Sequence, residues 1–210
     1  MEKFLTREVS SFFSDFFQSF FPTRVAKIGF CMYNKIVFLY QETREDDQMS
    51  WNSVREYLSQ FGAESRMIAF PVSSATVALA AQALNVDPAR IAKTLTFRYQ
   101  GGCVAIVVAG DARVDNSLFK AFFHEKAVML TADQVEEMTG HAVGAVCPFA
   151  LKLGVPVYLD ESLRRFQTVF PAAGTSSSAI ELSLEELFLF SGAKGWILVS
   201  KGWQQTENEG

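Results

Sequence analysis

The sequence predicts an α/β domain of the α+β type, in which helices surround a mixed, mostly antiparallel central sheet. Two observations carry this prediction. Short apolar runs bounded by glycine, proline or polar residues alternate with helical patterns, and the runs 94–99 and 103–109 flank Gln100-Gly101-Gly102, which is typical of a β-hairpin. Because hairpins and helices are mixed along the chain, a regular parallel repeat is disfavoured.

The first part of the predicted domain, up to the hairpin, alternates helix and strand patterns. A helix starts at Ser50 as a candidate N-cap and ends at Gly62, because apolar residues recur between them at intervals of three and four. Ser73 or Ser74 can cap the Ala-rich helix that follows. In chain order, the predicted elements are a helix, a strand, a helix and a short helical piece, over 50–62, 67–72, 75–84 and 87–92.

After the hairpin, three helices and five strands are predicted. Capping boxes at Thr131 and Ser183, each with Gln or Glu three residues later, mark two of the helix starts. The helices are predicted over 114–124, over 131–139 and from 183 onward. The strands are predicted over 127–130, 155–159, 166–169, 179–182 and 196–199.

Phenylalanine is distributed unevenly, with nine of the 20 residues in the first 48 positions of the 210-residue chain. An acidic, polar run over 41–48 follows this region. We therefore predict an N-terminal Phe-rich extension and acidic linker over 1–48, the main domain over 49–203 and a frayed polar tail over 204–210.

The Phe-rich extension contains an amphipathic helix, because phenylalanines recur at helical spacing from Phe12 to Phe21 ahead of Pro22. One interpretation is a helix that contacts a membrane surface or a partner through residues 1–21. The other is a helix packed on its own domain, or an extension from an upstream start, and we favour it over membrane contact. The apolar stretch 28–40 is too short to span a bilayer.

Charge and cysteine content narrow the function classes. Nineteen Lys and Arg against 23 Asp and Glu give a net charge of −4 and a pI of about 5.3, so the chain lacks the basic surface of a protein that coats DNA or RNA. We expect no DNA partner, and any RNA contact must be local. The three cysteines and two histidines show no zinc-ligand spacing, which predicts no metal, no cofactor, free thiols and a cytoplasmic location.

The segment 139–149, TGHAVGAVCPF, is the most unusual in the chain. Two glycines and a proline permit backbone conformations that can direct several N–H groups toward one point, as an oxyanion site requires, although tight turns have the same composition. His141 is either a general base or a residue that satisfies a nearby carbonyl or carboxylate. Cys147 is either a nucleophile or a small loop residue, and without a local activating group we favour the latter.

Lys93 lies between a short helix and an apolar strand. Its ammonium could meet a phosphate or carboxylate there, or it could extend into solvent. The turn that follows the hairpin, over 109–115, contains Asp111, Arg113 and Asp115. We interpret its two carboxylates as caps of the next helix rather than as acid or base catalysts.

A series of short segments between Met49 and Lys201 resembles the YbaK/prolyl-tRNA-synthetase-associated editing domains, a family of aminoacyl-tRNA deacylases. Their order and spacing carry the resemblance. The segments are Ser74-Ala75-Thr76-Val77, Ile91-Ala92-Lys93-Thr94-Leu95, Ala109-Gly110-Asp111, Thr139-Gly140-His141 with Gly144 and Pro148, Tyr158-Leu159-Asp160, Ala173-Gly174 and Ile180-Glu181-Leu182.

The resemblance implies a YbaK-like fold and a free-standing enzyme that hydrolyses the ester between a wrong amino acid and the 3'-terminal adenosine of a tRNA. The implied partners are the aminoacyl-tRNA 3' end and an aminoacyl-tRNA synthetase. Lys93 falls on the family's functional lysine at the tRNA terminus, and Gly144 and Pro148 fall on its G-x-x-x-P loop. The resemblance thus gives Lys93, Gly144 and Pro148 as catalytic, and His141, Ala145, Val146, Cys147 and Gly174 as substrate-binding.

One departure bears on specificity. Some relatives carry an aspartate just before the Ile-Glu-Leu run, where this chain has Ser176-Ser177-Ser178-Ala179. The amino acid that is edited therefore does not follow from the resemblance. A rival hypothesis is a non-catalytic module that binds an aminoacyl-tRNA or a synthetase.

Overall fold

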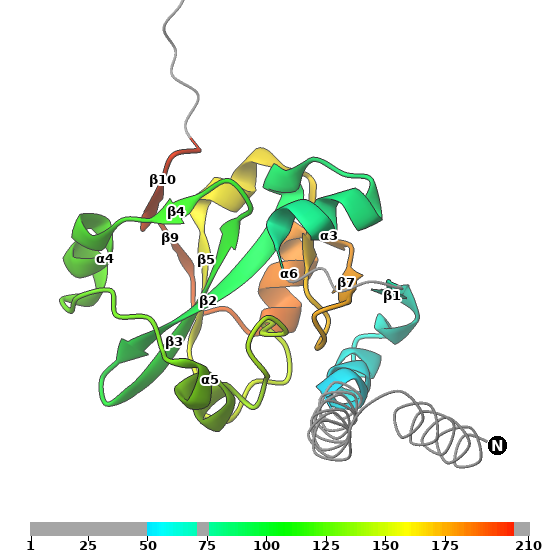
Figure 1. The fold of residues 1–210 in the computed structure, drawn as a ribbon, viewed down its shortest axis with the longest axis horizontal. Coiled ribbons are helices and arrows are strands. Elements are labelled where there is room, and N and C mark those ends of the chain that lie inside the picture. The colour runs from blue at the N-terminus through cyan, green and yellow to red at the C-terminus, as the bar shows by residue number, and fades with distance from the viewer. Residues whose placement is uncertain (1–49, 71–75, 204–210) are drawn as a thin grey trace, which may run out of the picture. The chain divides into compact units, whose positions relative to one another are not determined.

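The computed structural model describes residues 50–70 and 76–203 (Figure 1). The predicted extension 1–48 with its Phe-rich helix, the acidic linker and the tail 204–210 lie outside the described residues. In the described part of the chain, no helix is both long enough and apolar enough to cross a membrane.

A six-stranded mixed sheet, in the order β8-β6-β2-β3-β5-β9, forms the centre of the described residues. Its strands are Leu182–Ser183, Thr168–Pro171, Ile91–Tyr99, Gly102–Ala109, Val157–Asp160 and Trp196–Ile197, in that spatial order. The long hairpin of β2 and β3 is antiparallel, as its turn predicts, and so is the β6–β8 pair. The pairings β2–β6, β3–β5 and β5–β9 are parallel, so the mixed sheet is confirmed, with its antiparallel part concentrated in the hairpin.

Two small antiparallel sheets flank the central one. β1 (Met67–Ala69) pairs with β7 (Ser178–Ile180), and β4 (Arg113–Val114) pairs with β10 (Ser200–Lys201). In Figure 1, β4, β10 and α4 lie toward one side of the view and α3, α6 and β7 toward the other, with β2 and β3 between them.

The core is built on β3, whose residues 104–109 are fully buried because β2 and β5 flank the strand. Its run of valine, alanine and isoleucine is typical of a strand covered on both faces. Phe119, Leu163 and Leu187 are also fully buried and belong to the same hydrophobic cluster. They come from α4 (Asn116–Phe123), η3 (Glu161–Arg165) and α6 (Leu184–Ser191).

Local sequence signals set several helix ends as predicted. The capping boxes at Thr131 and Ser183 open α5 (Ala132–Thr139) and α6. The helix over 50–59 ends in a Schellman motif, in which Gly62 takes a φ of 66° and the N–H of Ala63 donates to the carbonyl of Leu58. Asp87 caps η2 (Pro88–Arg90), and η1 spans Glu64–Arg66.

Four predicted details were wrong. Ser50 is not an N-cap but lies within the helix, and α3 (Val77–Leu84) is capped by Thr76 rather than by Ser73 or Ser74. The predicted strand 127–130 is reduced to a bridge between Met129 and Phe97, because this segment meets β2 over too few residues to form a ladder. The helix predicted from 114 begins at Asn116, since Val114 pairs with β10.

Candidate active site

A cavity of about 380 Å³ opens beside β2. Five segments line it: α3, residues 91–96 of β2, residues between 129 and 135, the loop from Val143 to Val146, and residues between 170 and 179. This volume lies within the range of small-molecule sites. Most of its walls are apolar, while several Thr and Ser residues and Lys93 add polar groups.

Among the described residues, one edge of β2 has no neighbouring strand over part of its length, and the cavity lies there. β6 pairs with β2 only at Ile91 and Ala92, and the next contact on that edge is the Leu130 N–H, which donates to the Thr96 carbonyl. The intervening residues of β2 face the cavity instead of a strand. A break in the sheet therefore creates the site.

Thr94 supplies polar atoms at the centre of this open edge. The Thr96 carbonyl and the Arg98 N–H both bond to residues 128–130, on the side opposite β3. Alternate residues of an antiparallel strand direct both backbone groups to the same side, so the N–H and carbonyl of Thr94 also face this edge. Its hydroxyl is buried and has no hydrogen-bond partner among the described residues.

Lys93 lines the cavity and is half-buried. Its Nζ donates to the Ala112 carbonyl at 2.6 Å, so the side chain does not simply extend into solvent. Burial lowers the pKa of the Lys93 ammonium, the nearby Asp111 carboxylate opposes this shift, and Arg113 adds to it. The structure thus holds a cation at the cavity wall through a single backbone carbonyl.

The loop 142–146 forms a tight turn beside the cavity. The Ala145 N–H donates to the Ala142 carbonyl at 3.0 Å, and Gly144 has a φ of 86°, as the third position of a type II turn requires. Gly144 and Val146 both line the cavity. In the described part of the chain, the N–H of neither residue makes a hydrogen bond.

His141 lies outside the cavity lining and is buried. Its Nε2 lies 2.9 Å from the Phe149 carbonyl, which only accepts, so Nε2 carries the proton and Nδ1 accepts from the Ser50 hydroxyl at 3.0 Å. Burial lowers the pKa of the imidazole, which keeps it neutral at pH 7. Of the two interpretations of His141, these contacts favour the one that satisfies a carbonyl.

Cys147 lies against the same carbonyl and is fully buried. Burial raises the pKa of the Cys147 thiol to about 12, so at neutral pH it is protonated and a poor nucleophile. The structure therefore favours the small loop residue over the nucleophile. Cys103, also buried, is a free thiol like Cys147.

The remaining predicted site residues form the support behind the loop. Ala145 and Pro148 are buried and do not line the cavity. Gly174 has a φ of 94°, and a Cβ there would lie 2.8 Å from the Ser50 carbonyl oxygen. Gly174 thus allows the helix over 50–59 to pack closely against the backbone at Gly174. The structure brings Lys93, Gly144 and Val146 together at the cavity.

Sequence reasoning named no site residue among several that line the cavity. Thr94 directly follows Lys93, while Phe170, Thr175 and Ser178 come from later segments. Ser178 lies in the stretch where some relatives carry aspartate, and its hydroxyl bonds to the backbone of Thr175. Among the described residues, no group of three His, Cys, Asp or Glu side chains could hold a metal ion.

Comparison with known proteins agrees with this arrangement. Residues 72–190 match the aminoacyl-tRNA editing domain family. The chain belongs to this family. The match contains the cavity-lining part of β2 and the loop 143–146, and it confirms the resemblance inferred from the motifs.

Two relatives and one solved structure illustrate the range of similar proteins. Uncharacterized protein YwhH of Bacillus subtilis is 50% identical over 157 residues, which cover 74% of this chain and 100% of YwhH. A proline–tRNA ligase of Caldicellulosiruptor saccharolyticus is 32% identical over 82 residues, 39% of this chain but only 14% of the ligase. The crystal structure of a proposed trans-editing enzyme for prolyl tRNA synthetase has a TM-score of 0.67 at 28% identity, covering 73% of this chain and 98% of the other.

Proposed function

We propose that this protein is a free-standing aminoacyl-tRNA deacylase that hydrolyses the ester of a mischarged amino acid at the 3'-terminal adenosine of a tRNA. The observation that carries the proposal is the cavity, which joins a half-buried lysine and a glycine turn whose N–H groups make no hydrogen bond within the described residues. The chain belongs to the aminoacyl-tRNA editing domain family. The similar proteins support a free-standing form, because YwhH and the proposed trans-editing enzyme are covered almost completely by the match.

The reaction requires only alignment and charge stabilisation. Water adds to the ester carbonyl carbon, the carbonyl oxygen becomes an oxyanion, and its collapse breaks the bond to the 3'-oxygen, which leaves with a proton. The products are a free amino acid and a tRNA with an intact 3'-hydroxyl. Since an ester is already activated, oriented N–H donors and a positioned water, which the neighbouring 2'-hydroxyl can orient, are sufficient, and no cofactor enters the balance.

The turn of the loop supplies the donors in this proposal. Gly144 and Val146 line the cavity, and neither N–H makes a hydrogen bond within the described residues. Two such donors directed at a developing oxyanion are a common device in acyl transfer, and each is worth about 10²–10³ in rate. Pro148, buried at the end of the loop, restricts the backbone that carries them.

Lys93 is proposed to bind the tRNA end. Its ammonium lies at the cavity wall and can exchange or share its contact with the Ala112 carbonyl for a phosphate or ribose oxygen. One local cation suits a protein of net charge −4, because the ligand is the end of the tRNA rather than a long stretch of its backbone. Because the proposed substrate is an aminoacyl-tRNA, we also expect the protein to act in the cytoplasm and to contact an aminoacyl-tRNA synthetase.

The test is a panel of mischarged tRNAs, carrying alanine, serine, cysteine or proline, incubated with the purified full-length chain. We expect release from at least one member above the buffer rate, and loss of that release in Lys93→Ala. Lys152→Ala is the matched control, because Lys152 also donates to a backbone carbonyl, that of Glu137 at 2.7 Å, but does not line the cavity.

A non-catalytic module that binds aminoacyl-tRNA or a synthetase is the alternative outcome of this test. Binding of the tRNAs without release from any member would reject the deacylase and support the module. Equal loss of release in the Lys93 and Lys152 variants would reject the assigned role of Lys93.

A further inference from the structure

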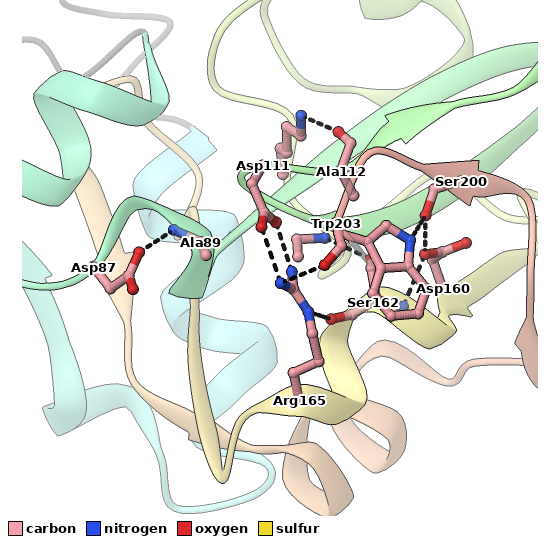
Figure 2. A network of polar contacts seen from close by, with 11 residues as sticks. Asp87, Ala89, Asp111, Ala112, Asp160, Ser162, Arg165, Ser200 and Trp203 are labelled. Carbon is pink, nitrogen blue, oxygen red and sulfur yellow. Dashed lines mark hydrogen bonds and ion pairs between the residues drawn. The ribbon is translucent and has the colours of Figure 1, made fainter. Parts of the chain in front are cut away.

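The helix η3 contacts the turn that joins β3 to β4 at two points, Ala109 and Asp111 (Figure 2). At one end, the Ala109 N–H donates to the Ser162 hydroxyl at 3.1 Å. At the other, Arg165 and Asp111 form a two-pronged ion pair, with Nη2–Oδ1 at 2.6 Å and Nη1–Oδ2 at 2.9 Å. The turn is thus fixed from one side by two residues of a single short helix.

The other side of the turn is fixed by close backbone contact. The Gly110 N–H donates to the Ala89 carbonyl at 3.2 Å, and a Cβ on Gly110 would lie 1.9 Å from the Pro88 carbonyl oxygen. The turn therefore lies between η2 and η3 with no space for a side chain at its tip. Ala112, the last residue of the turn, is fully buried, and its carbonyl accepts from Lys93.

The helix η3 is in turn anchored deep in the protein. Asp160 is fully buried and accepts hydrogen bonds from the Ser162 N–H, the Val199 N–H and the Ser200 hydroxyl. Asp160 caps the start of η3 and Arg165 ends it, and the two are joined through Ser162 and, by a second route, through Trp203 and Ser200 (Figure 2). A chain of contacts consequently runs from the core through η3 and Asp111 to the carbonyl that holds the Lys93 ammonium.

We propose that the Asp111–Arg165 ion pair positions Lys93. The pair fixes the Ala112 carbonyl, and with it a negative charge, beside the ammonium of Lys93. Asp111 was interpreted from the sequence as a helix cap. In the structure only Asp115 caps α4, so the carboxylate of Asp111 is left for this second role. The expected effect on catalysis rests on the proposed function, whereas the positioning of Lys93 does not.

The charges around Lys93 predict in which direction its pKa changes when one of them is removed. Asp111 raises the pKa of the Lys93 ammonium and Arg113 lowers it, while burial lowers it further. In the described part of the chain, the Arg165 guanidinium pairs with the Asp111 carboxylate and also donates to the Trp203 carbonyl. Removal of the Asp111 charge should therefore lower the pKa of Lys93, and removal of the Arg113 charge should raise it.

The experiment measures the titration of Lys93 without any tRNA. The full-length protein is acetylated with a limiting reagent across a range of pH, and the Lys93 peptide is quantified by mass spectrometry, because only the neutral amine reacts. We expect the midpoint to move to lower pH in Asp111→Asn and to higher pH in Arg113→Gln. Glu186→Gln is the matched control, since Glu186 forms a similar two-pronged pair with Arg66 away from Lys93, and its midpoint should equal that of the wild type. An unchanged or raised midpoint in Asp111→Asn would overturn the proposal.

The same three variants are then assayed for amino-acid release from the tRNA that the wild type deacylates. We expect Asp111→Asn to lose on the order of tenfold in kcat/KM, the scale of a small misplacement of a binding group, while Glu186→Gln retains the wild-type value. Wild-type activity in Asp111→Asn would reject the positioning role. No release by the wild type, together with the expected midpoints, would reject the proposed function and leave the positioning of Lys93 supported.

Discussion

His141 is the residue whose proposed structural role leads to the most specific prediction. In His141→Ala, the Phe149 carbonyl loses its Nε2–H donor and the Ser50 hydroxyl loses its acceptor, while a fully buried ring is removed. Among the described residues, the Phe149 carbonyl then keeps only the weaker Cys147 thiol donor at 3.6 Å, a loss of about 1 kcal/mol, and the hydrogen bond to the Ser50 hydroxyl contributes about 1 kcal/mol. With the packing loss, we expect the free energy of unfolding to fall by about 3 kcal/mol.

Urea unfolding measures this loss. With an m-value of about 2 kcal/mol/M, the midpoint should fall by about 1.5 M. His124→Asn is the control, because His124 is exposed and caps α4 in the left-handed conformation that asparagine tolerates. A midpoint within 0.3 M of the wild type in His141→Ala, with deacylation abolished, would refute the structural role and support a general base.

The pH dependence of stability gives a second readout of His141. Because burial lowers its pKa below the ordinary value of 6.5, the unfolded chain binds a proton that the folded protein resists. This histidine therefore leaves stability unaffected above pH 6.5 and reduces it as the pH falls below 6.5, by at most about 1.4 kcal/mol per pH unit. His141→Ala should remove this part of the slope, and an unaltered slope would contradict it.

Two further predictions test the support of the site. Gly110→Ala should lower the free energy of unfolding by about 2 kcal/mol or more, because its Cβ would overlap the Pro88 carbonyl oxygen and the backbone must shift; a wild-type urea midpoint would show that the contact is looser than described. Cys147 should react with a thiol reagent at pH 8 only after denaturation, because its thiol is buried with a pKa of about 12; rapid labelling of the native protein at this position, located by mass spectrometry, would contradict its burial.

The parts of the fold that depend on neighbouring residues could be predicted from the sequence. The stop at Gly62, the capping boxes at Thr131 and Ser183, and the β2–β3 hairpin each rest on signals within a few residues, and each is confirmed. The parallel pairings could not be predicted in the same way. Parallel strands are joined by long connections, and β2 meets β6 across some 80 residues, so no local pattern reports the register.

The candidate site shows the same division. Lys93 and Gly144 were found because they lie in recognisable motifs, and the structure brings them to one cavity. Thr94 was missed because its importance depends on the break between β6 and the segment 128–130, which is a tertiary feature. Asp111 was predicted to cap the next helix, but its carboxylate accepts from Arg165 instead. These two residues are 54 positions apart, so no local pattern indicates the contact.

The most direct measurement of the central claim is a crystal structure of the protein with a non-hydrolysable aminoacyl-adenosine in which an amide replaces the 3'-ester. The account predicts that the analogue occupies the cavity beside β2, with its carbonyl oxygen within hydrogen-bond distance of the Gly144 or Val146 N–H and its ribose or phosphate end at the Lys93 Nζ. An analogue bound with its carbonyl away from this loop, or on another surface of the protein, would contradict it.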